Sequence, residues 1–184
     1  MMSDYLIYPA PLDSELEGPF DGCEPLDLLI SGPRPAKYVA GEPDGDRIRV
    51  RYFWSDADKT LKGRVWFGQG AEGPPGYAHG GSIAALLDEV MGISGWASGW
   101  KVVAAEISVR FNRPTNLGAV HTFEGQVTNV DGRRITCEST LWSSSGDVLA
   151  TSSGTFMEMR PEMLDKLREN LTEVPRWLME PERE

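Results

Sequence analysis

The residues best suited to chemistry are His79-Gly80-Gly81 and a carboxylate, Asp88, nine residues after the histidine. Prolines and glycines crowd residues 73–76, and an almost wholly apolar helical pattern begins at Ser82, which predicts a sharp turn into a buried helix. The Gly80 N–H would lie at the positive end of that helix, where negative charge developing on an oxygen is stabilised. Asp88, two turns along the same face, could act as a base or a nucleophile.

Each of these residues also has an ordinary interpretation. Gly80-Gly81 could serve only as a tight turn from loop to helix. Asp88 could be a solvated helical acid, and periodicity does not exclude this because Glu89 has similar neighbours. A buried carboxylate without partners is costly, so the position of Asp88 on an apolar helix favours a functional role.

The elements that must position these residues are strands, because most of the chain after Arg47 alternates apolar and polar side chains. In the cleanest case Val103, Ala105 and Ile107 are predicted to share one face and Ala104 and Ser108 the other. Strands are expected at 47–54, 61–67, 103–112, 120–130, 135–141 and 148–159. Consecutive antiparallel strands behind one buried helix indicate an α+β fold with a sheet wrapped round the helix.

The chain divides into three parts by composition. Residues 1–45 are rich in proline and glycine and are expected to form an arm or lid, with a helical turn near 26–30 packing on the body. Residues 46–160 are expected to form one domain. Residues 161–184 are expected to form a short helix opened by Pro161 and a polar tail.

Charge and composition exclude several classes of partner. The formal net charge is −10 and the pI about 4.7, which argues against nucleic acid or an anionic membrane. Two cysteines without CxxC spacing and two scattered histidines predict reduced thiols and no structural metal. His121 is expected to be a satisfied sheet residue. No secretory signal and no membrane-length apolar run is present, which favours the cytoplasm.

Residues 60–160 resemble the hotdog-fold acyl-CoA thioesterases, in the branch of the phenylacetate-degradation enzymes and the mammalian mitochondrial thioesterase-superfamily members. The resemblance is carried by His79-Gly80-Gly81 with Asp88, by Arg113-Pro114 after a strand, and by Gly132-Arg133-Arg134 at the next turn. It implies a hotdog fold, with an antiparallel sheet of five or six strands around one long central helix. It also implies hydrolysis of an acyl-CoA thioester to free acid and coenzyme A, without a metal or redox cofactor.

The resemblance assigns roles to particular residues. It gives Asp88 the part of functional acid, the Gly80 N–H that of oxyanion donor, and His79 that of shaping the turn with Gly81. It places basic residues such as Arg133 and Arg134 near the coenzyme A phosphates. With Arg110 and Arg113 they would form a local cationic patch, which an acidic chain needs to bind a polyanion. Solvated turn and strand residues are the alternative.

The resemblance also implies assembly and reveals one departure. In the family two protomers join their sheets edge to edge and share each site, so we expect at least a dimer and often a pair of dimers. A serine or threonine commonly lies ten residues before the proline of the Arg-Pro corner, where this chain has Ala104. Ser108 or a substrate-held water could compensate, or Asp88 could work unaided, which predicts a slow thioesterase. The alternatives are a non-hydrolysing acyl-CoA binder and a hydrolase of acyl carrier protein thioesters.

Overall fold

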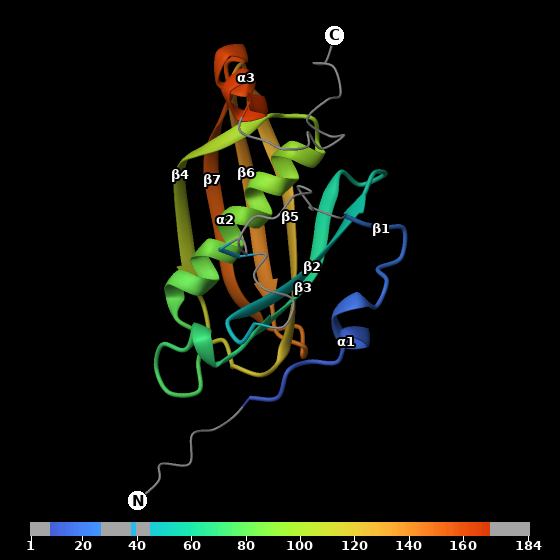
Figure 1. Cartoon of the computed structure of the whole chain (residues 1–184), viewed down its shortest axis with the longest axis vertical. Helices are drawn as coiled ribbons and strands as arrows, with labels where there is room; N and C mark the ends of the chain where they lie inside the picture. Colours follow the sequence, from blue (N-terminus) through green and yellow to red (C-terminus); the bar gives the residue numbers. More distant parts are fainter. Residues whose placement is uncertain (1–7, 27–37, 40–44, 170–184) are drawn as a thin grey trace, which may run out of the picture.

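The computed structural model describes residues 8–26, 38–39 and 45–169. Among these residues seven strands form one antiparallel sheet in the order β1-β2-β3-β5-β6-β7-β4, and helix α2 lies across one of its faces (Figure 1). The strands are β1 (Glu24–Pro25), β2 (Ile48–Ser55), β3 (Thr60–Phe67), β4 (Val102–Phe111), β5 (Val120–Asp131), β6 (Arg134–Trp142) and β7 (Val148–Glu158). The helices are α1 (Asp13–Glu17), α2 (Gly80–Ala97) and α3 (Pro161–Glu169), with a 3₁₀ turn η1 (Gln69–Ala71). The predicted α+β class is confirmed, and the two-residue β1 adds a seventh strand to the six expected.

Alternation of apolar and polar residues accounts for most of the sheet. In β2 the side chains of Ile48, Val50 and Tyr52 are buried on the face that α2 covers. Asp131 pairs with Arg134 across a tight hairpin in which Gly132 has a φ of 56°, a conformation that glycine adopts without strain. None of the described helices is long and apolar enough to cross a membrane.

Helix α2 is the centre of the core. It begins at Gly80, two residues before the predicted start at Ser82, because His79 already caps it. Its Leu86, Leu87, Val90 and Met91 side chains are fully buried against the sheet. The next contact is polar: the Ser139 hydroxyl donates to the Leu87 carbonyl at 3.3 Å and lies 2.6 Å from the Ser152 hydroxyl. These buried contacts hold the helix in place directly before Asp88.

Strand β4 contains a bulge that changes which side chains face the helix. Ala104 pairs with Phe156 and Glu106 with Thr155, so Ala105 is the extra residue. Since Phe156 and Gly154 are buried on the α2 side, their partners Ala104 and Ile107 lie on that side too. The predicted face of Val103, Ala105 and Ile107 is therefore wrong, because strict alternation does not continue through a bulge.

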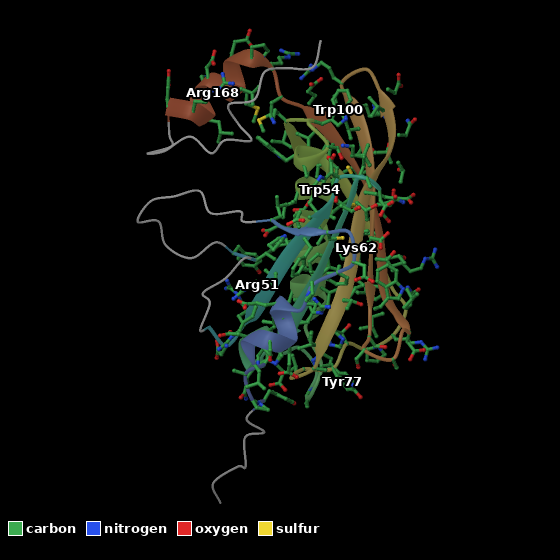
Figure 2. All side chains as sticks on the ribbon, turned by 90° about the vertical axis from the view of Figure 1, so that its right-hand side faces the viewer. Arg51, Trp54, Lys62, Tyr77, Trp100 and Arg168 are labelled. Atoms are coloured by element: carbon green, nitrogen blue, oxygen red, sulfur yellow. The ribbon has the colours of Figure 1, made fainter. Side chains whose placement is uncertain are left out.

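The N-terminal segment passes around the β2 edge of the sheet. On the face away from α2, the Phe20 ring packs against Phe53 with centroids 5.3 Å apart, and the Arg64 guanidinium lies 4.1 Å over Phe20. The Glu17 carboxylate of α1 lies 3.6 Å from Arg51, which Figure 2 labels beside α1. β1 then pairs with β2 at the edge itself.

Two sequence expectations fall largely outside the described residues. The helical turn near 26–30 lies there except for Leu26, and so does the tail from 172 to 184. Helix α3 begins at Pro161 as predicted, and its buried Leu164 packs with Met159 against Trp96. The domain boundaries proposed at 45 and 160 stay predictions.

Candidate functional site

His79, Gly80 and Gly81 form the first turn of α2. The His79 Nδ1 atom accepts a hydrogen bond from the Gly81 N–H at 2.9 Å, so the imidazole caps the helix. The Gly80 N–H donates to no acceptor in the part of the chain that the structure describes. A Cβ on Gly80 would lie 3.4 Å from the Phe111 ring, so Phe111 is the side-chain neighbour of this turn. The turn therefore presents a donor at the positive end of a helix.

The loop before α2 is held from two sides. The His79 N–H donates to the Ala71 carbonyl at 2.7 Å, and the Ala78 N–H donates to the Thr115 carbonyl at 2.9 Å. His121 supports this second side, because its Nε2 lies 3.0 Å from the Asn116 carbonyl oxygen. The expectation of a satisfied His121 is only half right: Nδ1 is buried without a partner among the described residues, and burial lowers the imidazole pKa.

Asp88 is half-buried on α2, in the wall of a cavity of about 550 Å³. Its carboxylate accepts no hydrogen bond within the described residues, and desolvation raises its pKa above the ordinary aspartate value. A raised pKa makes a carboxylate a stronger proton acceptor than an exposed one. Asp88 therefore has the environment of a general base.

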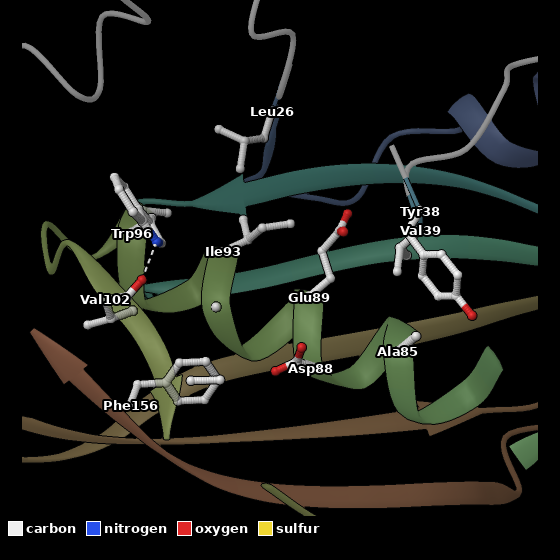
Figure 3. Close-up of a pocket in the computed structure, with 13 residues that line it drawn as sticks. Leu26, Tyr38, Val39, Ala85, Asp88, Glu89, Ile93, Trp96, Val102 and Phe156 are labelled. Atoms are coloured by element: carbon white, nitrogen blue, oxygen red, sulfur yellow. Dashed lines mark hydrogen bonds between the residues drawn. The ribbon is translucent and has the colours of Figure 1, made fainter. Parts of the chain in front are cut away.

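The cavity lies between α2, the start of β4 and the N-terminal segment (Figure 3). Its lining is mainly apolar and comprises Leu26, Tyr38, Val39, Ala85, Asp88, Glu89, Gly92, Ile93, Trp96, Ala97, Val102, Ala104 and Phe156. Ala104 shares this wall with Asp88, so the position without a hydroxyl does lie at the site. Ser108 pairs with the exposed Ser153 on the face away from α2 and cannot take the place of that hydroxyl. A cavity of this size and lining suits a small organic ligand.

Within one chain the donor and the acid are far apart. Gly80 and Asp88 are eight residues apart on the same helix, which corresponds to about 12 Å along its axis. A carbonyl held beside Asp88 is therefore out of reach of the Gly80 N–H of the same chain. One chain therefore holds two candidate half-sites, the Gly80 turn and the Asp88 wall of the cavity.

Strand β4 runs past both half-sites and is the last strand of the sheet among the described residues. Apolar side chains on it are unusually exposed: Val103 by 37%, Ile107 by 39% and Phe111 by 52%. Ala104, near one end, lines the cavity with Asp88, and Phe111, at the other end, lies against Gly80. An uncovered edge with exposed apolar residues is typical of a surface that pairs with another strand.

The four arginines do not form one patch. Arg134 pairs with Met157 of β7 and the Arg133 guanidinium donates to the Glu158 carbonyl at 2.6 Å. Arg110 pairs with Thr151 of the same strand, which places it about 20 Å further along. Arg113 lies beyond it, 3.4 Å from Asp147. The predicted single cationic patch is therefore wrong for one chain, because the two arginine pairs occupy opposite ends of the sheet.

Sequence reasoning missed two parts of the cavity. The N-terminal residues Leu26 and Val39 carry no periodic signal that would place them over α2. The second part is a buried polar pair, in which the Tyr52 hydroxyl donates to the Glu89 carboxylate at 2.5 Å. Burial, followed by the Glu89 charge, raises the Tyr52 pKa, so the hydroxyl stays protonated as a donor. Period-two alternation in β2 could have shown that Tyr52 faces the helix, but not its partner.

Neither thiol nor metal chemistry is visible in the described residues. Among them no group of three or more His, Cys, Asp and Glu side chains could hold a metal ion. Cys23 and Cys137 are both free, and burial raises the pKa of Cys137 to about 12. A thiol with such a pKa is a poor nucleophile at neutral pH.

Comparison with known proteins identifies the relatives of this site. Residues 75–150, which include both half-sites, match the model of the thioesterase superfamily. The chain is 26% identical over 121 residues to the acyl-coenzyme A thioesterase THEM4 of Xenopus laevis, covering 65% of this chain and 54% of the relative. It is 29% identical over 92 residues to mouse THEM5, covering 50% and 37%. The chain thus spans about half or less of the length of these curated relatives.

Solved structures extend the likeness to the fold. A thioesterase superfamily protein is 34% identical, with a TM-score of 0.57, over 59% of this chain and 53% of that one. The E. coli PaaI protein of the phenylacetic acid degradation operon has a TM-score of 0.53 at 17% identity, over 55% and 74%. A Streptococcus mutans protein bound to acetyl CoA gives 0.53 at 18%, over 55% and 82%. The resemblance to the hotdog thioesterases is confirmed.

Proposed function

We propose that this protein hydrolyses an acyl-CoA thioester to the free acid and coenzyme A. The observation that carries the proposal is the half-buried Asp88 carboxylate, set in an apolar cavity within the segment that matches the thioesterase superfamily. The names of the relatives support the reaction, since THEM4 and THEM5 are called acyl-coenzyme A thioesterases. The acetyl CoA bound to the S. mutans structure supports the ligand class.

The chemistry needs only two devices. Asp88 accepts a proton from water as the water oxygen adds to the thioester carbonyl, or it attacks that carbonyl itself to form a mixed anhydride, which a water then hydrolyses to the free acid and Asp88. The carbonyl oxygen becomes negative, and the Gly80 N–H donates to it at the helix N-terminus. The C–S bond then breaks and coenzyme A leaves as a thiolate, which needs little protonation.

The two devices come from two chains in this proposal. An antiparallel pairing of β4 with the same strand of a second protomer reverses its direction. The Phe111 end of one strand, beside Gly80, then meets the Ala104 end of the other, beside the partner subunit's Asp88. The exposed apolar edge of β4 supports such a dimer. A pair of dimers and a cytoplasmic location stay predictions.

Ala104 supports a second candidate, an acyl-CoA binder with little turnover. A hydroxyl at this position could hold the attacking water beside Asp88, and the alanine methyl group cannot. We place hydrolysis first because the raised Asp88 pKa suits a base, whereas a binder gains nothing from a partly desolvated carboxylate.

The test is release of free coenzyme A from a panel of acyl-CoAs, followed with a thiol reagent. Asp88→Asn keeps the side-chain volume but removes the base, so we expect kcat to fall by about 10²–10⁴-fold. Glu89→Gln is the matched control, because it removes a charge from the same cavity while its amide oxygen can still accept from Tyr52. The control is expected to lose far less activity, and equal losses would remove Asp88 from the mechanism.

The pH profile of the wild-type protein is a second measure of the same role. Asp88 must be ionised to act, so activity falls as the pH drops through its pKa. Because burial raises that pKa, the acidic limb of kcat/KM should lie above the pH at which an exposed aspartate titrates. A limb at the ordinary aspartate value would contradict a buried base.

A further inference from the structure

Three residues of α2 stand in line along the cavity wall. Asp88, Gly92 and Trp96 are spaced four residues apart and all line the cavity, in which Figure 3 labels Asp88 and Trp96. Residues at this spacing lie on one face of a helix, each about 6 Å from the next along the axis. The Asp88 carboxylate, the space left by Gly92 and the Trp96 ring therefore follow one another over about 12 Å of the helix axis.

Gly92 provides the gap. A Cβ built there would have the Phe156 ring as its nearest neighbour, at 3.7 Å, which is ordinary contact. Alanine would therefore fit at this position, and it would stabilise the helix interior relative to glycine. Because Gly92 lines the cavity, its missing side chain leaves space in the cavity next to Asp88.

Trp96 closes the far end of the cavity. Its indole N–H donates to the Val102 carbonyl at 2.9 Å, and the Lys101 ammonium lies 5.6 Å from the ring centroid. The ring also packs against the cluster of Met159 and Leu164. These contacts hold the indole in place as a wall of the cavity.

The opposite wall comes from outside the segment that matches the family model. Leu26 and Val39 line the cavity, whereas the match begins at residue 75. The Leu26 N–H donates to the Tyr52 carbonyl at 2.9 Å, which ties this residue to β2. The Arg47 guanidinium lies 4.7 Å over the Tyr38 ring and donates to the Tyr38 carbonyl at 2.7 Å, which fixes the neighbour of Val39. The chain therefore builds its own cover over the line from Asp88 to Trp96.

We infer that the acyl group of the substrate starts beside Asp88, passes over Gly92 and ends against Trp96. The substrate class is then a coenzyme A thioester of an uncharged, apolar acid, because the lining is apolar and two carboxylates, Asp88 and Glu89, repel an acyl group with a second carboxylate. Gly92 sets the width of the path for the acyl group and Trp96 sets its length, so these two residues determine the specificity. This inference rests on the proposed hydrolysis.

The test compares kcat/KM across saturated acyl-CoAs from acetyl to palmitoyl, with succinyl-CoA as the charged probe. Gly92→Leu fills the path, so it should lower kcat/KM for the longer acyl groups by about tenfold or more while acetyl-CoA changes far less. Trp96→Leu shortens the wall and should move the preferred length upward. Gly92→Ala controls for the change in helix propensity and should lie between wild type and Gly92→Leu.

The outcomes separate this inference from the proposed function. A wild-type protein that cleaves no acyl-CoA overturns the function and, with it, the inference. A wild-type protein that cleaves acyl-CoA, while Gly92→Leu lowers all chain lengths equally and Trp96→Leu shifts none, overturns the inference alone. Preference for succinyl-CoA would also overturn it. Thermal unfolding of each variant identifies a folding defect. Gly92→Leu and Trp96→Leu change different parts of the path, so if one variant fails to fold, the other still tests the inference.

Discussion

The two edges of the sheet differ in whether another segment covers them. At the β2 edge the N-terminal segment adds β1 and covers Phe53 with Phe20, and Arg64 lies over both rings. At the β4 edge no described segment adds a strand, and Val103, Ile107 and Phe111 are exposed. Natural sheets usually protect their edges, so an uncovered apolar edge is the exception that needs a reason.

The difference indicates which edge a second protomer would cover in the proposed dimer. The covered edge contributes stability, because on the face away from α2 its contacts are the packing of Phe20 on Phe53 and the stacking of Arg64 on both rings. The uncovered edge contributes Ala104 to the cavity and Phe111 to the turn at Gly80. The chemistry and the missing partner are therefore expected at the same edge.

The largest effect is expected from a charge placed on the uncovered edge. Ile107→Lys should dissociate the proposed dimer and lower kcat/KM by about a hundredfold or more, because the Gly80 donor and the acid no longer meet. Analytical ultracentrifugation and the coenzyme A release assay measure the two effects.

Phe20→Ala is the matched change at the covered edge. It should lower the free energy of unfolding by about 1–3 kcal/mol through lost packing on Phe53, with the assembly unchanged. An Ile107→Lys protein that stays dimeric and active, or a Phe20→Ala protein that dissociates, would show that the edges have been assigned the wrong way round.

A smaller effect is expected from the arginines at one end of the sheet. Arg133→Ala with Arg134→Ala should raise KM for acyl-CoA several-fold more than KM for a short thioester without the nucleotide, because lost ground-state contacts raise KM selectively. Arg110→Ala with Arg113→Ala, at the other end, is the matched pair. If both pairs act alike on both substrates, phosphate binding lies elsewhere.

The smallest effect is expected from a hydroxyl added at the uncovered edge, beside Asp88. Ala104→Thr adds a hydroxyl to the wall that Asp88 shares and should raise kcat about threefold to tenfold, the worth of one positioning hydrogen bond of about 0.5–1.5 kcal/mol. Affinity for a non-hydrolysable acyl-CoA analogue should change little. Binding without turnover in the wild type, and no gain in the variant, would favour the binder over the hydrolase.

The fold could be predicted where periodicity decides it. Alternation located β2, β3 and the β5–β6 hairpin within a residue or two, and the apolar run after Gly81 located α2. Trp66 shows the limit of this reasoning: alternation puts it on the solvent side, yet it is buried, with the Arg49 guanidinium 5.3 Å from its ring. Burial there comes from tertiary contacts that no local pattern records.

The candidate site was predictable in its residues but not in its geometry. The motif selected His79 and Asp88, which lie at the start of α2 and in the cavity wall, and the resemblance selected Ala104, which shares that wall; their roles stay predictions. The arginines were wrongly joined because Arg110 and Arg134 belong to different strands, β4 and β6, that pair with β7 at positions far apart along it, which the sequence alone does not reveal. The cavity wall formed by Leu26 and Val39 depends on how a segment without periodicity returns over the helix.

The bulge at Ala105 decides which residue of β4 faces the cavity beside Asp88. If Ala105 entered the ladder, the start of β4 would move by one position and every side chain before it would turn to the other face. Ala105 would then face Phe156, and Ala104 would turn from the cavity toward the outer face. The neighbour of the acid is thus set by strand register as well as by residue type, and at this bulge both registers place an alanine, Ala104 or Ala105, opposite Phe156.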